Sequence, residues 1–93
     1  MDVAESVRSF IVDELGWGGD PAVLTGDYPL MGRRVIDSLG ILQLVTFLER
    51  EYRIRIGDEE VVPDNLGSLD AIARLVEDKT VVRGVTRQTR RER

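Results

Sequence analysis

The sequence predicts an all-α fold: a bundle of three main helices plus one short helix, with a long loop between helices one and two. Apolar residues recur at helical spacing in three stretches, at about residues 2–15, 38–52 and 68–79. Between the first two stretches, residues 16–37 contain five glycines and two prolines, which exclude a continuous helix. The chain has 93 residues, enough for one domain with one core.

The first helix is predicted over residues 2–15. Asp2 is placed to cap its start, and Gly16 is placed to end it. The expected buried positions follow the helical period: Val3, Val7, Phe10, Ile11 and Leu15.

The long loop is not purely polar, and a loop of this length in a compact domain is often functional. We expect its apolar residues to hold it across the bundle: Trp17, Leu24, Tyr28, Leu30 and Met31. The loop is long enough to cross the bundle, so helices one and two need not be hairpin neighbours.

The second helix is predicted to begin at Asp37 or Ser38 and to end near Tyr52. A rotation of about 100° per residue gathers its core residues on one stripe: Ile41, Leu44, Val45, Leu48 and Tyr52. Leu39 and Leu42 fall outside this stripe. Periodicity alone leaves two interpretations of them equally open, a docking surface or a face covered by the long loop.

After the second helix, Ile54 and Ile56 are expected to be buried by a short extended return. Asp58 to Val61 is predicted as the short helical turn, and residues 63–65 have turn chemistry. The last helix is predicted over residues 68–79, with Ser68 as its cap. We expect residues 1–79 to form the domain and residues 80–93 to form a basic, flexible tail.

Charge divides the chain in the same place. Residues 1–79 carry 16 acidic and 8 basic residues, a net charge of −8, whereas residues 80–93 carry five arginines and one glutamate, a net charge of +4. An acidic body repels nucleic acid phosphates and favours partners with basic docking surfaces. We therefore expect no nucleic acid partner.

Composition excludes several classes of function. Cysteine and histidine are both absent, so disulfides, thiolate nucleophiles and sites built on histidine are excluded, and an enzyme is disfavoured. Acidic residues 58–60 lack the pattern of a calcium loop, and no metal site is predicted. The longest uncharged run, from Ser38 to Leu48, is far shorter than the ~20 residues of a membrane span. With an acidic N-terminus unlike a signal peptide, we expect a cytoplasmic monomer without a membrane partner.

The triplet Asp37-Ser38-Leu39 lies where the loop becomes a helix. Its plain structural interpretation is a helix cap followed by the first residues of the helix. A second interpretation is modification, because backbone N–H groups and the helix dipole favour an anion such as a phosphate ester at this point.

The surrounding sequence resembles the acyl carrier protein family, which includes peptidyl carriers. The resemblance covers about residues 3–78. It lies in three segments: Pro29-Leu30-Met31-Gly32 with Val35-Ile36-Asp37-Ser38-Leu39-Gly40-Ile41-Leu42-Gln43-Leu44-Val45, Leu48-Glu49-Arg50-Glu51-Tyr52 with Ile56, and Ser68-Leu69-Asp70-Ala71-Ile72-Ala73.

This resemblance implies that Ser38, preceded by Asp37, receives 4′-phosphopantetheine from coenzyme A and carries an acyl or aminoacyl group as a thioester. The chain would then be a non-catalytic carrier whose cofactor supplies the reactive sulfur. The implied partners are a phosphopantetheinyl transferase, a loading enzyme and downstream synthase or tailoring enzymes. Leu39, Leu42 and Gln43, just after the serine, are the expected docking residues.

Departures from the family pattern bear on the subtype. Arg33-Arg34 stand where peptidyl carrier domains have paired glycines, and the second helix has fewer acids than fatty-acid-type carriers. These features favour a discrete carrier of bacterial specialised biosynthesis, of polyketide or nonribosomal peptide type. The alternatives are a D-alanyl-carrier-like or fatty-acid-type carrier and, in another class, an unmodified helical adaptor protein.

Overall fold

The computed structural model describes the backbone of residues 2–85 and the side chains of residues 2–80. Within this range the regular elements are all helical, which confirms the all-α prediction. They are α1 (Val3–Asp13), the 3-10 turn η1 (Pro21–Val23), α2 (Ser38–Tyr52), the 3-10 turn η2 (Asp58–Glu60), α3 (Pro63–Leu66) and α4 (Leu69–Val85).

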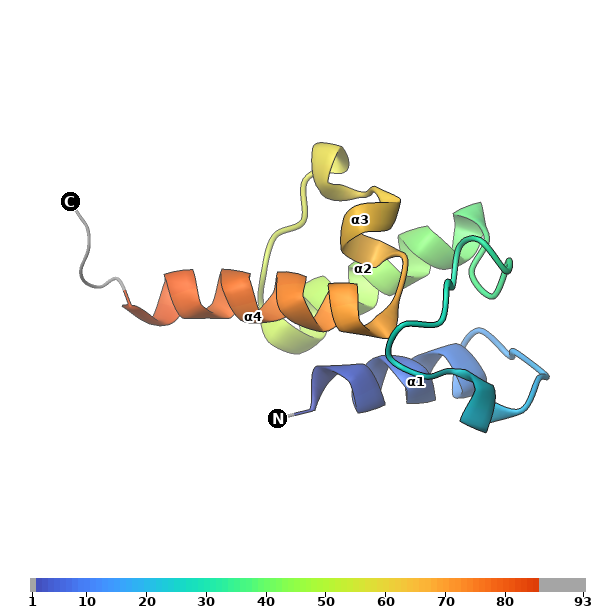
Figure 1. Ribbon diagram of the computed structural model, residues 1–93. Coiled ribbons are helices and arrows are strands. Elements are labelled where there is room, and N and C mark those ends of the chain that lie inside the picture. The colour runs from blue at the N-terminus through green and yellow to red at the C-terminus, as the bar shows by residue number, and fades with distance from the viewer. Residues whose placement is uncertain (1, 86–93) are drawn as a thin grey trace.

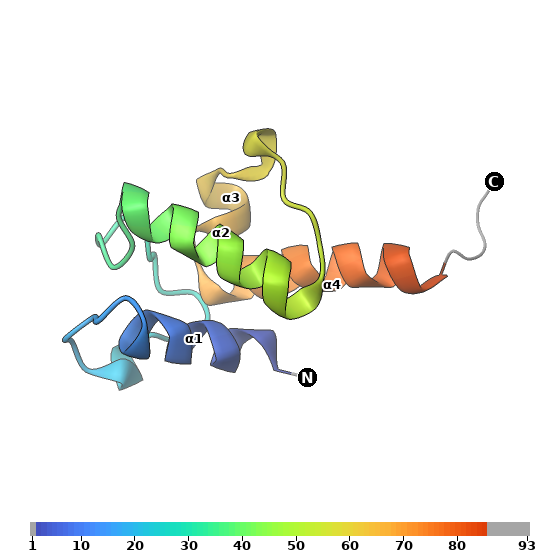
Figure 2. The same cartoon turned by 180° about the vertical axis from the view of Figure 1, so that it is seen from behind.

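Helix α4 is the element that joins the others. It contacts α1, α2 and α3, and Figure 1 shows it running lengthwise with α1 along one side and the short α3 on the other. From behind, α2 lies between α1 and α3 (Figure 2). The predicted bundle is therefore built around the last helix, and the long loop connects α1 to α2.

The core is one cluster of apolar side chains from all four α-helices and the loops. Leu44 and Leu48 of α2 are fully buried, and Ile41 and Tyr52 are nearly so. Val45, predicted on the same stripe, is half-buried at its edge. Burying a side chain of this size contributes roughly 1.5–3 kcal/mol relative to leaving it exposed, so the predicted face of α2 is the one that holds the bundle together.

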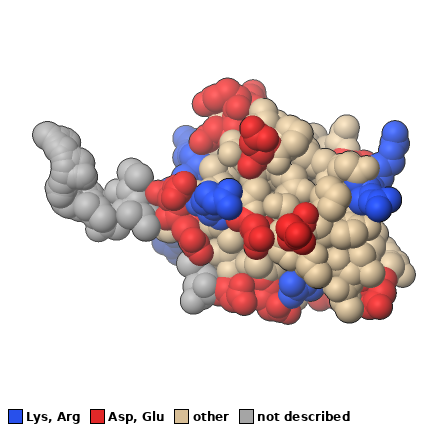
Figure 3. All heavy atoms as spheres, in the orientation of Figure 1, with Lys and Arg blue, Asp and Glu red and all other residues tan. Residues whose placement is uncertain are grey.

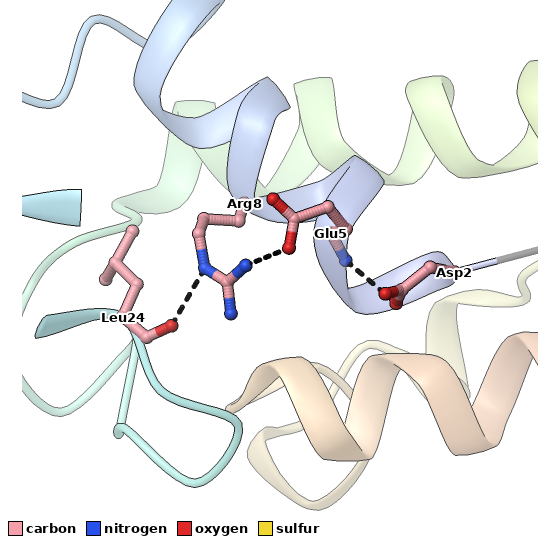
Figure 4. Close-up of polar contacts among 4 residues, drawn as sticks. All are labelled: Asp2, Glu5, Arg8 and Leu24. Carbon is pink, nitrogen blue, oxygen red and sulfur yellow. Dashed lines mark hydrogen bonds and ion pairs between the residues drawn. The ribbon is translucent and has the colours of Figure 1, made fainter. Parts of the chain in front are cut away.

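Helix α1 is capped and tied to the long loop by polar contacts. The Asp2 carboxylate accepts a hydrogen bond from the Glu5 amide at 3.2 Å, as predicted. Arg8 pairs with Glu5 on the same helix and donates from Nε to the Leu24 carbonyl at 3.0 Å (Figure 4). The helix ends at Asp13, two residues before the predicted end, and Gly16 follows in the left-handed region with a φ of +70°.

The apolar residues of the long loop do hold it against the bundle. Leu24 and Leu30 are fully buried, and the other three predicted residues, Trp17, Tyr28 and Met31, pack partly buried against the core. The Leu30 amide also donates to the Gly67 carbonyl at 2.8 Å, just before α4. The segment that precedes Ser38 is therefore held both by buried apolar side chains and by a backbone hydrogen bond.

The return from α2 to α3 buries Ile54 and Ile56, as predicted. The Ile56 amide donates to Glu49 at 2.8 Å. In η2, Glu60 accepts from the Gly57 amide at 2.9 Å and forms an ion pair with Lys79 of α4 at 2.9 Å. These contacts stabilise the carboxylate form, so the pKa of Glu60 is lowered, first by the Gly57 hydrogen bond and then by Lys79.

Two further predictions, for the second half of the chain, were wrong. Residues 63–65, predicted to have turn chemistry, lie in the helix α3, because Pro63 occupies the first helical position, where its missing N–H costs nothing. Helix α4 starts as predicted, with Ser68 Oγ accepting from the Ala71 amide at 3.1 Å, but it continues to Val85 rather than ending at residue 79. Residues 80–85 of the predicted flexible tail are therefore helical, and residues 86–93 lie outside the described residues.

Candidate functional site

Ser38 is the first residue of α2, and its side chain is exposed. The cap of this helix is Asp37, whose Oδ1 accepts a hydrogen bond from the Gly40 amide at 2.8 Å. The sequence left open whether Asp37 or Ser38 caps the helix, and the structure assigns this role to Asp37. The Ser38 hydroxyl is therefore not used for capping and faces solvent at the positive end of the helix dipole.

Close packing fixes the approach to Ser38. Val35 and Ile36 are buried, and their amides donate to the Leu30 carbonyl at 2.8 and 3.3 Å. Arg34 lies between the buried Leu30 and Val35, and it has a φ of +58°, in the left-handed region that glycine adopts most readily. The chain thus turns tightly before Asp37, at one of the two positions where the family pattern suggested glycine.

Gly40 allows the long loop and Leu15, which follows α1, to approach the start of α2. A Cβ at this position would lie 3.0 Å from Ile36 Cγ2, 3.3 Å from the Asp37 carboxylate and 3.4 Å from Leu15 Cδ1. A side chain here would displace Ile36 or the Asp37 cap, since such distances are tighter than ordinary contacts. Gly40 therefore contributes to the position of Ser38.

Leu39 and Leu42 project from the outer side of α2, next to Ser38. Their side chains are 65% and 64% exposed, which rules out the interpretation that the long loop covers them. Gln43 is exposed on the same side. The structure therefore brings all the sequence-predicted site residues onto one surface at the start of α2.

Two hollows lie along this surface. A small depression of about 200 Å³ at the start of α2 is lined by Arg34, Asp37, Leu39 and Gln43, among others, and not by Ser38 itself. A larger hollow of about 650 Å³ lies further along α2, between α1 and α2. We call it the α1–α2 groove, and its lining residues are Phe10, Glu14, Leu42, Gln43, Thr46, Phe47, Arg50 and Glu51.

Sequence reasoning missed the aromatic pair in this groove. Phe10 of α1 and Phe47 of α2 stack with ring centroids 4.5 Å apart and an interplanar angle of 21°. The available signal was that Phe47 lies off the core stripe of its helix. Periodicity within one helix shows that such a residue lacks a place in the core but does not identify its partner on another helix.

The electrostatic character of the described surface is acidic. Figure 3 shows acidic side chains gathered over α4 and at the top of the view, with fewer basic side chains between them.

None of the helices within residues 2–85 combines the length and the apolar character needed to cross a membrane.

Comparisons with known proteins complete the description of this site. No protein-family model matches the chain. Several curated proteins are similar to it. Among them, the "Acyl carrier protein" of Solidesulfovibrio magneticus is 37% identical over 60 residues, which cover 64% of this chain and 74% of that protein. The "Probable acyl carrier protein PigG" of Serratia sp. is 32% identical over 59 residues, which cover 63% of this chain and 68% of that protein.

Proposed function

This chain belongs to the acyl carrier protein family, and on that premise we propose that it carries an acyl or aminoacyl group as a thioester on 4′-phosphopantetheine attached to Ser38. The observation that carries the proposal is the division of roles at the start of α2. Asp37 caps the helix, which leaves an exposed serine hydroxyl at an anion-favouring helix end.

The residues around Ser38 fit such an arm. The hydroxyl is accessible to a transferase, and the phosphodiester would stand at the positive end of α2. Arg34 lines the same depression as Asp37, the residue that precedes Ser38, and so adds a positive charge to the start of α2. Asp37 places a negative charge next to it, but this carboxylate is held by the Gly40 amide in its capping role. When bound, the arm supplies a terminal thiol, the group that this chain, which has no cysteine, cannot provide itself.

In the modification step, the Ser38 hydroxyl oxygen attacks the pantetheine-linked phosphorus of coenzyme A. The new bond is a phosphodiester, the pyrophosphate bond breaks, and adenosine bisphosphate leaves. In this proposal the serine proton passes to a base of the transferase. The chain's own part is to hold the hydroxyl outward on a rigid helix end.

We also propose the type of biosynthesis that this carrier serves. The first eleven residues of α2, Ser38 to Leu48, carry no charge, and Arg34 stands in a glycine-like conformation before the site. These features support a carrier of specialised bacterial biosynthesis, of polyketide or nonribosomal peptide type, served by a transferase, a loading enzyme and a synthase. A D-alanyl or fatty-acid-type cargo is the alternative within the family.

One experiment separates a carrier from an unmodified adaptor, the rival favoured by the exposed Leu39 and Leu42. The protein is incubated with coenzyme A, magnesium and a broad-specificity phosphopantetheinyl transferase, and its intact mass is recorded beside a control carrier. We expect the addition of one phosphopantetheine. An unchanged mass, with the control carrier modified in the same tube, would support the adaptor instead.

A further inference from the structure

We propose that the α1–α2 groove is a docking site for the transferase that modifies Ser38, and that it receives an apolar side chain flanked by a basic residue of that enzyme. This inference rests on the proposed function. It adds α1 to a recognition surface that the sequence placed on α2 alone.

The floor of the groove is apolar and open to solvent. The stacked rings of Phe10 and Phe47 are only partly buried, and Leu42 beside them is 64% exposed. Two aromatic rings and a leucine gathered in one hollow give an apolar side chain of a partner a surface to pack against. A groove of about 650 Å³ has room for a large apolar anchor of the kind that dominates binding energy.

The walls of the groove are acidic on both sides. Glu14 comes from α1 and Glu51 from α2, and both are exposed. Arg50 is the basic residue in the lining, so the groove as a whole carries a negative charge. An acidic rim around an apolar floor complements a basic residue beside an apolar side chain, and such complementarity chiefly sets the rate and register of association.

The groove lies within reach of an enzyme seated on Ser38. At a rise of about 1.5 Å per residue, Phe47 is roughly 13 Å along α2 from Ser38. Gln43 lines both the groove and the depression at the start of α2, so the two hollows adjoin at this residue. A standard protein interface covers about 800 Å² on each partner, which is broad enough to include both.

The test compares neighbouring acidic residues of α1 that differ in their relation to the groove. Glu14 lines it, whereas Asp13, next to it and also exposed, does not. Glu14→Arg and Asp13→Arg therefore change the net charge identically. We expect Glu14→Arg to lower kcat/KM for phosphopantetheine transfer by roughly ten-fold at low salt, less at high salt, and Asp13→Arg to stay within about two-fold of wild type.

A second pair of variants tests the apolar floor. Thr46→Trp fills the groove, and Arg74→Trp places the same side chain on an exposed position of α4. We expect roughly ten-fold lower kcat/KM for Thr46→Trp at both salt concentrations and no change for Arg74→Trp. Circular dichroism melts establish that each variant is folded.

The outcomes separate the two proposals. A wild-type protein that is never modified overturns the carrier function and this inference with it. A modified wild type with equal kcat/KM for Glu14→Arg and Asp13→Arg overturns the docking site alone. Concentration-dependent self-association of the wild type, lost in Thr46→Trp by sedimentation, would assign the groove to a second copy of the chain and also overturn the inference.

Discussion

The Asp37 carboxylate accepts a hydrogen bond from the Gly40 amide at 2.8 Å, which closes the first turn of α2. One residue on, Ser38 begins the helix without serving as its cap. Stability and function are thereby assigned to neighbouring side chains. A modification of Ser38 does not have to break the contact that starts the helix.

This relationship predicts unequal effects of substitution at the two positions. Asp37→Ala removes the cap and should lower the free energy of unfolding by about 1 kcal/mol. Ser38→Ala should change it by no more than about 0.5 kcal/mol, because the serine is exposed and not a cap. Urea unfolding measures both, with Asp37→Asn as a control that keeps a capping oxygen. A larger loss for Ser38→Ala than for Asp37→Ala would mean that the serine caps the helix.

The core of α2 provides the second prediction. Leu44 and Leu48 are fully buried, so Leu44→Ala and Leu48→Ala should each cost roughly 2–5 kcal/mol of unfolding free energy. A domain of this size has a total unfolding free energy of about 5–10 kcal/mol, so both variants should melt well below the parent. Melting temperatures equal to that of the parent would show that this face of α2 is not the core.

The third prediction separates docking from folding at Leu42. Because its side chain is 64% exposed, Leu42→Ala should change stability by no more than about 0.5 kcal/mol. The loss of an apolar anchor should still lower the efficiency of Ser38 modification several-fold, since such anchors contribute about 2 kcal/mol or more to binding. Val23→Ala, at an apolar residue of η1 that is 41% exposed, is the matched control. The opposite pattern, lost stability with intact modification, would remove Leu42 from the docking surface.

The fourth prediction concerns pH and the contact of Glu60 with Gly57 and Lys79. These partners lower the pKa of Glu60 in the folded state below its ordinary value of 4.5. The ionised carboxylate therefore stabilises the fold above pH 4.5, and this contribution is lost as the pH falls through the lowered pKa of the folded state. Unfolding free energies of wild type and Glu60→Gln, measured from neutral pH downward, should differ at pH 7 and converge in acid. A difference independent of pH would contradict the assignment.

The sequence was sufficient to predict the helices that begin with a cap and bury a regular stripe. Helix α2 has both, and its bounds, Ser38–Tyr52, agree with the prediction. The end of α4 was missed because β-branched residues and Gly84 reduce helix propensity by only about 1 kcal/mol or less each, whereas a helix that has started extends readily.

The part of the candidate site that lies on α2 alone was predictable from the sequence, because it depends on the period of one helix. The angle of Leu39 and Leu42 on a single helix placed them off the core stripe, and the structure was needed to show that the long loop leaves them exposed. The Phe10–Phe47 stack joins residues of two helices separated by the long loop, and periodicity within one helix contains no information on such a pair. The groove therefore became visible only in three dimensions.

The central claim is that Ser38 takes the phosphopantetheine arm, and matched serine variants test it most directly. Ser38→Ala and Ser9→Ala each remove one exposed serine hydroxyl, from α2 and α1 respectively. Each is incubated with coenzyme A, magnesium and a broad-specificity transferase, and its intact mass is measured. We predict that wild type and Ser9→Ala gain one phosphopantetheine and that Ser38→Ala gains none. Modification of Ser38→Ala, or a wild type that stays unmodified beside a modified control carrier, would contradict the account.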